Sequence, residues 1–364
     1  MNVTTHLEML SESDARAFRN VILRLKAQPE AEPSPGLHDR IMTQIHQKRK
    51  MPVLLWWAAA AASLAVLFGL AGVLQRALPP GGRHTALAAA SGDIRWLAEN
   101  QEADGTWDPA RHGGAETFRP ALTALALLAL HQEAAAYTGP ISKGVTALAA
   151  LQAADGSFGG NDGQAKLYNL AMATCALATC GGADNPALTH AVTRIKGCQG
   201  PDGSWTYTQE SNAAVTAWMT RALECAEARG NADAAIPLRK GLRWLRGNVR
   251  DDGRIAYHPT SAPSDTLTAL SAYSLLAAGK FPDLQTLGRR MTDALTVQPT
   301  GAAAPDCYRD YAKIIAFESA GKAASAESVR TQIRQRRSTA AHDQWDIAGG
   351  HIYTAALATL CRAQ

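Results

Sequence analysis

The stretch Gln101-Glu-Ala-Asp-Gly105-Thr-Trp107 recurs as Gln152-Ala-Ala-Asp-Gly156-Ser-Phe158 and again as Gln199-Gly-Pro-Asp-Gly203-Ser-Trp205. A fourth copy, Asp252-Gly253-Arg254-Ile255, keeps the Asp-Gly pair but has neither the Gln nor the aromatic residue. The four glycines lie 51, 47 and 50 residues apart. A period in this range is typical of repeat proteins, in which each repeat is one supersecondary unit. The chain from about residue 85 onward is therefore predicted to be a repeat domain.

Helices of two kinds alternate around these loops. Amphipathic helices are predicted before the turns, at residues 143–152, 188–197 and 237–249. Strongly apolar helices are predicted at residues 121–130, 168–180, 213–225, 266–278, 308–320 and 352–361. Because a helix that is apolar all round is buried, six inner helices inside six outer ones predict an all-α, closed (α/α)6 toroid. An open solenoid is the alternative, but neither end of the repeats carries a polar capping repeat.

The Gln-x-x-x-Gly-x-Trp pattern resembles the QW repeat of squalene-hopene and oxidosqualene cyclases, whose toroid also occurs in the β subunits of protein prenyltransferases. Lys143-Gly144 and Lys240-Gly241 lie thirteen residues before a repeat glycine, as an upstream Lys-Gly does in that repeat. The resemblance covers residues 85–364. It implies that the glutamines and aromatic residues tie successive helices together and perform no chemistry. The residues with this structural role are Gln101, Gly105, Trp107, Gln152, Gly156, Phe158, Gln199, Gly203 and Trp205.

Composition limits the classes of function. Hydrophobic residues make up 46% of the 364 residues, enough for one large core, and the net charge is only +4. No block of Lys and Arg is interleaved with aromatic residues, so nucleic-acid binding is not expected. The six cysteines show no framework spacing, and we expect most of them to be small buried hydrophobic residues.

Residues 53–74 form a run of 22 residues without a charge, long enough to cross the hydrocarbon of a bilayer as a helix. Trp56 and Trp57 stand at its start, and the basic residues 48–50 precede it. The excess of positive charge on that side predicts an inner-membrane protein with its N-terminus in the cytoplasm and its toroid outside. A cleaved signal peptide or a buried Ala-rich helix is the alternative.

Four parts are predicted along the chain: a short cytoplasmic helical segment (1–50), the transmembrane helix (51–76), a linker (77–84) and the toroid (85–364). The first part has two short helical patterns around a Pro- and Glu-rich break at residues 29–36. This layout resembles the cytoplasmic region of anti-sigma factors. The resemblance implies a sigma factor as a possible partner.

A zinc site is the sharpest chemical hypothesis. Asp306-Cys307 begins the fifth apolar helix and His351 precedes the sixth, and the resemblance to prenyltransferases implies that such residues hold zinc. Asp, Cys and His with one open position form a catalytic zinc site. Neighbouring residues on a helix point about 100° apart, so Asp310 could replace Asp306 as a ligand. The alternative is a buried cysteine beside a histidine that is hydrogen-bonded at a helix end.

The starts of the inner helices are predicted to line a central cavity suited to an isoprenoid-like or other apolar ligand. Core packing explains the same side chains equally well. These candidates are Tyr168, Asn212, Trp218, Asp265, Tyr308 and Tyr353. The Asp-x-Asp-Asp acid motif of squalene-hopene cyclases is missing, and no spacing singles out a glycosidase pair among Glu116, Asp265 and Asp310.

Three functions follow as hypotheses. The first is a membrane-anchored binding or interaction module for an apolar ligand or a protein. The second is a metal-dependent prenyl transferase or terpene cyclase-like enzyme, with zinc as its cofactor. The third is a transmembrane anti-sigma-like regulator with the toroid as its sensor.

Overall fold

The computed structural model describes residues 89–159, 163–182, 185–207, 211–258, 261–296, 306–338 and 346–361. Every described residue belongs to one compact unit, which is assigned to residues 68–364. The described residues form α-helices, short 3₁₀ turns and loops, with two isolated β-bridges and no strand. The all-α prediction is confirmed for this part of the chain.

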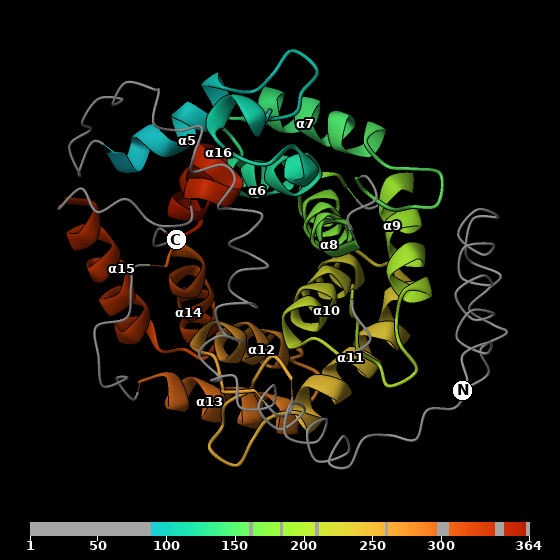
Figure 1. Ribbon diagram of the computed structural model, residues 1–364, viewed down its shortest axis with the longest axis vertical. Coiled ribbons are helices and arrows are strands. Elements are labelled where there is room, and N and C mark those ends of the chain that lie inside the picture. The colour runs from blue at the N-terminus through green and yellow to red at the C-terminus, as the bar shows by residue number, and fades with distance from the viewer. Residues whose placement is uncertain are drawn as a thin grey trace, which may run out of the picture. The chain divides into compact units, whose positions relative to one another are not determined.

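Outer and inner helices alternate along the chain, as the repeat predicts (Figure 1). The outer helices are α5 (Ala89–Glu99), α7 (Thr138–Ala150), α9 (Pro186–Gly197), α11 (Ala235–Gly247), α13 (Pro282–Thr296) and α15 (Ala323–Ser338). The inner helices are α6 (Arg119–His131), α8 (Gly163–Cys180), α10 (Ala213–Ala228), α12 (Asp265–Ala277), α14 (Cys307–Ser319) and α16 (Asp346–Leu360). Three 3₁₀ turns, η3 (Ala110–His112), η4 (Glu116–Phe118) and η5 (Ala232–Ala234), lie in the connections.

The ring is closed. Each inner helix packs against the next, and the last one, α16, packs against both α6 and α5 of the first hairpin (Figure 1). An open solenoid would leave the first and last hairpins without each other as neighbours. The described helices therefore form an (α/α)6 toroid.

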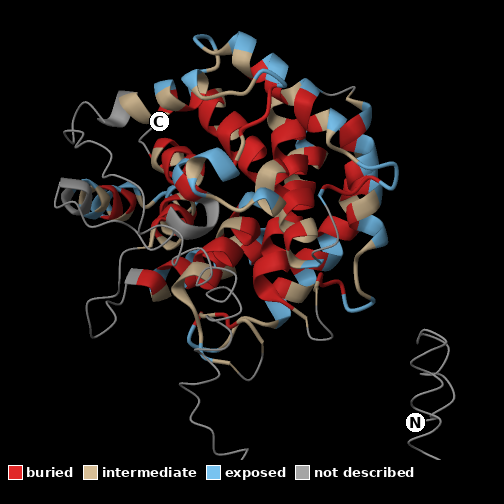
Figure 2. Ribbon diagram, turned by 45° about the horizontal axis from the view of Figure 1, so that its top comes forward, coloured by how far each residue is buried: buried red, intermediate tan, exposed pale blue. Residues whose placement is uncertain are grey.

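The inner helices form the core of the ring (Figure 2). In α6, Ala124, Ala126 and Ala129 are all fully buried, and small side chains of this kind let an inner helix be covered on every side. An outer helix buries one stripe instead. Leu238 and Leu242 of α11 are buried one turn apart, while the opposite face of that helix carries arginines.

The repeat loop is a hydrogen-bonded clamp between two hairpins. In the first copy, Gln101 Nε2 donates to the carbonyl oxygens of Gly105 (2.9 Å) and of Pro140 in α7 (2.9 Å). The Trp107 indole donates to the Leu97 carbonyl of α5 at 2.7 Å. One glutamine therefore fixes the turn and holds the next outer helix, as the sequence pattern implies.

The later copies repeat these bonds. Gln152 donates to Gly156 and Ala187, and Gln199 donates to Gly203 and Pro237. In the degenerate fourth copy, fully buried Ile255 takes the place of the aromatic residue. Its N–H donates to a threonine of the following inner helix, as the N–H groups of Trp107 and Trp205 do.

Gly203 is a position where any side chain would be costly. Its φ of +94° is unfavourable for other residues, and a Cβ there would lie 2.7 Å from the Lys240 carbonyl oxygen. We expect Gly203→Ala to lower the free energy of unfolding by at least about 3 kcal/mol, as strain and overpacking add. The matched control is Gly182→Ala, because Gly182 has a φ of +80° but nothing within 4 Å of its Cβ position. Denaturant titration should give about 1–2 kcal/mol for the control. Equal losses would mean that the contact with α11 does not matter.

Candidate functional site

The first turns of the inner helices gather at one end of the ring, because each outer helix returns the chain before the next inner helix begins. Five tyrosines meet there, and we call them the tyrosine cluster. Tyr168, Tyr308 and Tyr353 come from α8, α14 and α16, and Tyr207 and Tyr257 come from the loops before α10 and α12. All five are partly buried and pack against the core.

Contacts between these rings cross the ring of helices. The Tyr207 and Tyr257 hydroxyl oxygens lie 3.5 Å apart, and Tyr168 is hydrogen-bonded to Tyr257. Tyr308 stacks on Trp218 of α10 with centroids 6.1 Å apart and an 18° angle between the planes. The Trp218 indole N–H also donates to the Tyr308 hydroxyl. Since α12 lies between α10 and α14 around the ring, this stack links two inner helices that are not adjacent.

Burial favours the neutral phenols of Tyr168, Tyr308 and Tyr353. It raises the pKa of Tyr168 and of Tyr353 well above the ordinary tyrosine value, and that of Tyr308 in the same direction. A neutral phenol can donate one hydrogen bond and accept others. The cluster therefore offers both aromatic faces and hydrogen-bonding hydroxyls at one end of the ring.

Four of the six predicted cavity residues, Tyr168, Trp218, Tyr308 and Tyr353, belong to this assembly. The other two have structural partners. Asn212 is the N-cap of α10, where its Oδ1 accepts from Ala214 N at 2.9 Å. Asp265 lies between two cations, with Lys313 Nζ at 2.7 Å and Arg254 at 3.3 Å. Both side chains therefore stabilise the fold through these contacts.

Sequence reasoning missed Tyr207 and Tyr257 because they lie in loops. A signal was present: each stands two residues after the position of the repeat aromatic, Trp205 and Ile255. The first two copies have Pro109 and Gly160 at that place, so the tyrosine is specific to copies three and four.

Three of the four predicted zinc ligands, Asp306, Asp310 and His351, have other contacts in the structure. Asp306 is the N-cap of α14, and its Oδ1 accepts from the N–H groups of Tyr308 and Arg309 at 3.0 Å each. Burial raises the pKa of this carboxyl. The shift favours the neutral acid over the ionised carboxylate that would bind a metal ion. Cys307 is buried, and buried Asp310 lies 3.5 Å from the Arg309 guanidinium.

His351 lies at the seam where the ring closes. Its ring packs edge-on against Trp96 of α5 with centroids 4.2 Å apart, and Trp96 also contacts His112 in the same manner. Across the described ranges, no three His, Cys, Asp or Glu side chains are grouped closely enough to hold a metal ion. The structure therefore gives no support to the zinc site that we expected from Asp306, Cys307, Asp310 and His351.

The carboxylates considered for glycoside hydrolysis are also engaged. Glu116 lies at the surface and pairs with Arg119 at 2.6 Å, while Asp265 and Asp310 have the cationic partners described above. None of these contacts assembles an acid and base pair.

No described helix is both long enough and apolar enough to cross a membrane. The predicted anchor at residues 53–74 lies outside the described residues, as do the linker at 77–84 and the anti-sigma-like segment 1–50. Anchoring, cellular location and a sigma-factor partner remain predictions from the sequence.

No protein-family model matches the chain, and no curated protein matches it either. Among solved structures, it is similar to a family 76 glycoside hydrolase from a bovine Bacteroides thetaiotaomicron strain, with 10% identity, a TM-score of 0.52, and 76% of this chain and 77% of that chain covered. A protein from Actinoplanes has 14% identity and a TM-score of 0.48 over 76% of this chain and 99% of its own. An unsaturated glucuronyl hydrolase has 17% identity and a TM-score of 0.39 over 58% and 67%.

At 10% identity, the similarity to the glycoside hydrolase shows the toroid fold alone. The assignment to the prenyltransferase and squalene cyclase family is not supported by these structures, and neither is the anti-sigma resemblance. The repeat pattern predicted the architecture correctly, but the family it resembles is not shown.

Proposed function

We propose that the toroid is a binding module that takes a small ligand at the tyrosine cluster. The observation that carries this proposal is the convergence of Tyr168, Tyr207, Tyr257, Tyr308 and Tyr353 at one end of the ring. These residues come from several different repeats and from both helices and loops. Packing the core alone would not require a hydroxyl group on each of these rings.

The chemistry of the cluster favours a ligand with apolar faces and several hydroxyl groups, such as a saccharide. Aromatic rings supply the faces, and neutral phenols supply donors and acceptors that fix the orientation of the ligand. An isoprenoid hydrocarbon chain would cover the rings but leave displaced hydroxyls without partners, at a cost of about 1–3 kcal/mol for each buried group. The isoprenoid expected from the sequence is therefore the second choice.

Binding is favoured over catalysis because the acidic groups near the cluster are already engaged. Asp306 caps α14, and Asp265 is held between Lys313 and Arg254. A hydrolase of glycosidic bonds needs two carboxyl groups that face the substrate. The arrangement supports recognition of a ligand and offers no such pair among the described residues.

The test is a thermal-shift and calorimetric titration of the full chain with malto-oligosaccharides, cello-oligosaccharides and geranylgeranyl diphosphate. An oligosaccharide at 100 times its Kd should stabilise the fold by about 2.7 kcal/mol. Tyr308→Phe should weaken that binding about fivefold or more, because it removes one hydroxyl and keeps the ring.

Tyr137→Phe is the matched control, since Tyr137 is a partly buried tyrosine at the start of α7, outside the cluster. The affinity of this variant for the oligosaccharide should equal that of the unmodified chain. Binding of the isoprenoid alone would contradict the ligand class. Binding that Tyr308→Phe and Tyr257→Phe leave unchanged would contradict the site.

A further inference from the structure

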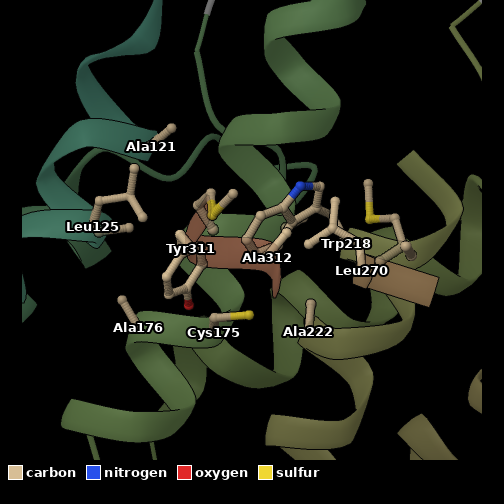
Figure 3. Packing of buried hydrophobic residues seen from close by; sticks show 14 of the residues in the cluster. Ala121, Leu125, Cys175, Ala176, Trp218, Ala222, Leu270, Tyr311 and Ala312 are labelled. Atoms are coloured by element: carbon tan, nitrogen blue, oxygen red, sulfur yellow. The ribbon is translucent and has the colours of Figure 1, made fainter. Parts of the chain in front are cut away.

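A second group of polar side chains lies inside the ring, further along the inner helices than the tyrosine cluster. Arg221, Glu224 and Cys225 lie on α10, one to two turns beyond Trp218, and Cys175 and Thr179 lie on α8, which packs against α10. We call these five residues the thiol cluster. Figure 3 shows Cys175 in its apolar surroundings, near Tyr311 and with its sulfur directed toward α10.

The two cysteines of the cluster are hydrogen-bonded to each other and are not joined by a disulfide. The hydrogen bond from Cys175 is the largest influence on Cys225 and lowers its pKa to about 6, with Arg221 and Thr179 acting in the same direction against desolvation. The same bond and burial raise the pKa of Cys175 well above its usual range. The Cys175 hydrogen bond and the Arg221 charge therefore favour the thiolate of Cys225, whereas burial favours the thiol of Cys175.

The charge that favours this thiolate is held in place by α12. The Arg221 guanidinium lies over the Tyr273 ring, 4.3 Å from its centroid, and donates a hydrogen bond to the Tyr273 hydroxyl. Arginine stays protonated in proteins, so the site keeps one fixed positive charge.

Glu224 leaves that charge available. Both of its carboxyl oxygens are buried and have no hydrogen-bond partner among the described residues, although the rest of the residue is partly exposed. Burial raises its pKa well above the usual glutamate value, which favours the neutral acid and lessens its competition for the charge of Arg221. A carboxylate in this place would compete with the Cys225 sulfur for the guanidinium.

Burial alone does not produce a reactive cysteine here. It raises the pKa of Cys180 to about 12 and also raises that of Cys198, as expected for sulfur in apolar surroundings. Cys180 is also on α8, five residues after Cys175, and its Sγ lies 3.7 Å from the Leu127 carbonyl oxygen. Burial is the largest influence on its pKa, ahead of the charges of Arg229 and Cys225, which makes Cys180 an internal reference for the cluster.

We propose that Cys225 and Cys175 form a dithiol that hydroperoxides oxidise. Cys225 is the residue oxidised first, and Cys175 is the resolving thiol. Cys225 is partly exposed, whereas Cys175 is only 1% exposed, so the oxidant reaches Cys225 first. This modification site is separate from the tyrosine cluster and does not depend on what binds there.

Oxidation takes two steps, and the peroxide is the only oxidant that they need. The Cys225 sulfur attacks one oxygen of the hydroperoxide, an S–O bond forms and the O–O bond breaks. The departing hydroxide or alkoxide takes a proton from water, so the peroxide is reduced and Cys225 becomes a sulfenic acid. The Cys175 sulfur then attacks the Cys225 sulfur, the S–O bond breaks, and hydroxide leaves as water with the proton of Cys175. The product is a disulfide between neighbouring inner helices.

The test is peptide mass spectrometry of the reduced full chain after treatment with a few equivalents of hydrogen peroxide. The expected result is a Cys175–Cys225 disulfide, formed while Cys180 and Cys198 stay reduced. Cys175→Ser should stop the reaction at a sulfenic acid on Cys225 that dimedone captures, and Cys180→Ser should leave the cross-link unchanged. A pulse of iodoacetamide at pH 7 should label Cys225 at least about tenfold faster than Cys180.

The unmodified chain carries the decisive comparison, so the test does not depend on any variant that fails to fold. Oxidation or labelling of Cys180 or Cys198 ahead of Cys225 would overturn the proposal. So would a chain that keeps its helical circular dichroism but yields no Cys175–Cys225 peptide.

Discussion

Removing α16 by ending the chain after Ser338 is expected to abolish cooperative folding of the toroid. Helix α16 packs against α5, α6 and α14, so its loss exposes buried faces on both sides of the gap. It also removes its own buried Ile352 and Leu357. A terminal hairpin of an open solenoid would expose only one interface when removed, and the remaining repeats would stay folded. Net stability of a domain is about 5–15 kcal/mol, which the loss of two apolar interfaces exceeds.

Circular dichroism during thermal unfolding measures this result. The matched control ends the chain at Cys361, which removes only residues 362–364 and keeps α16 intact. The control should unfold in one sharp transition, and the shorter chain should show a broad, low-amplitude change. A sharp transition in both chains would mean that the last hairpin does not close the ring.

Trp205→Ala is expected to lower the free energy of unfolding by about 3–5 kcal/mol, the usual range for a buried tryptophan replaced by alanine. The side chain is 1% exposed, and its indole donates to the Ile195 carbonyl of α9 at 2.8 Å. It also lies directly against Gly241 of α11, where a Cβ would come within 2.8 Å of the indole ring. The substitution therefore removes a contact between two hairpins and leaves a cavity at their junction.

Two variants separate the parts of this effect in a denaturant titration. Trp205→Phe keeps most of the apolar volume and loses the indole hydrogen bond, so it should cost roughly 1–2 kcal/mol. The second copy of the repeat already has Phe158 at this position. Trp244→Ala on α11 removes a tryptophan that is only partly buried and should cost less than Trp205→Ala. Equal losses for the two alanine variants would show that the loop clamp contributes nothing special.

The architecture could be predicted because the repeat pattern carries it locally. Each Gln-x-x-x-Gly-x-aromatic loop makes its hydrogen bonds within the loop or to the helices that precede and follow it, so a period of about fifty residues specifies one hairpin at a time. The apolar segments predicted as inner helices fall within α6, α8, α10, α12, α14 and α16 or extend a residue beyond them. Closure was favoured by the absence of capping repeats and is seen in the packing of α16 on α5 and α6.

The site could be predicted only in part because it depends on contacts between distant repeats. Trp218 and Tyr308 were expected at the inner-helix starts, but their stacking across the ring follows from closure and has no local signal. The zinc prediction placed Asp306 and His351 by analogy, whereas the structure uses one as a helix cap and packs the other against Trp96. An aspartate that caps a helix and a histidine that packs on a tryptophan are the same residue types as zinc ligands, so a sequence motif does not distinguish these roles.

The thiol cluster shows the same limit. Cys175 and Cys225 lie fifty residues apart on separate helices, and their spacing indicates nothing about their contact. Only the packing of α8 against α10 brings the two sulfurs together. The lack of a framework spacing predicts that most cysteines are small buried hydrophobic residues, and the raised pKa of Cys180 fits that prediction better than the lowered pKa of Cys225.

Closure of six hairpins into one ring is the central claim, because only closure brings Tyr353 and Tyr308 next to tyrosines of the earlier repeats. The most direct measurement is the unfolding transition of a circular permutant of residues 85–364, with the native ends linked and new ends opened at the exposed turn of Gly230 and Asn231. A closed ring predicts a permutant that melts cooperatively within about 5 °C of the unpermuted fragment, since every helix keeps its neighbours. A permutant that fails to fold while the unpermuted fragment folds would contradict closure.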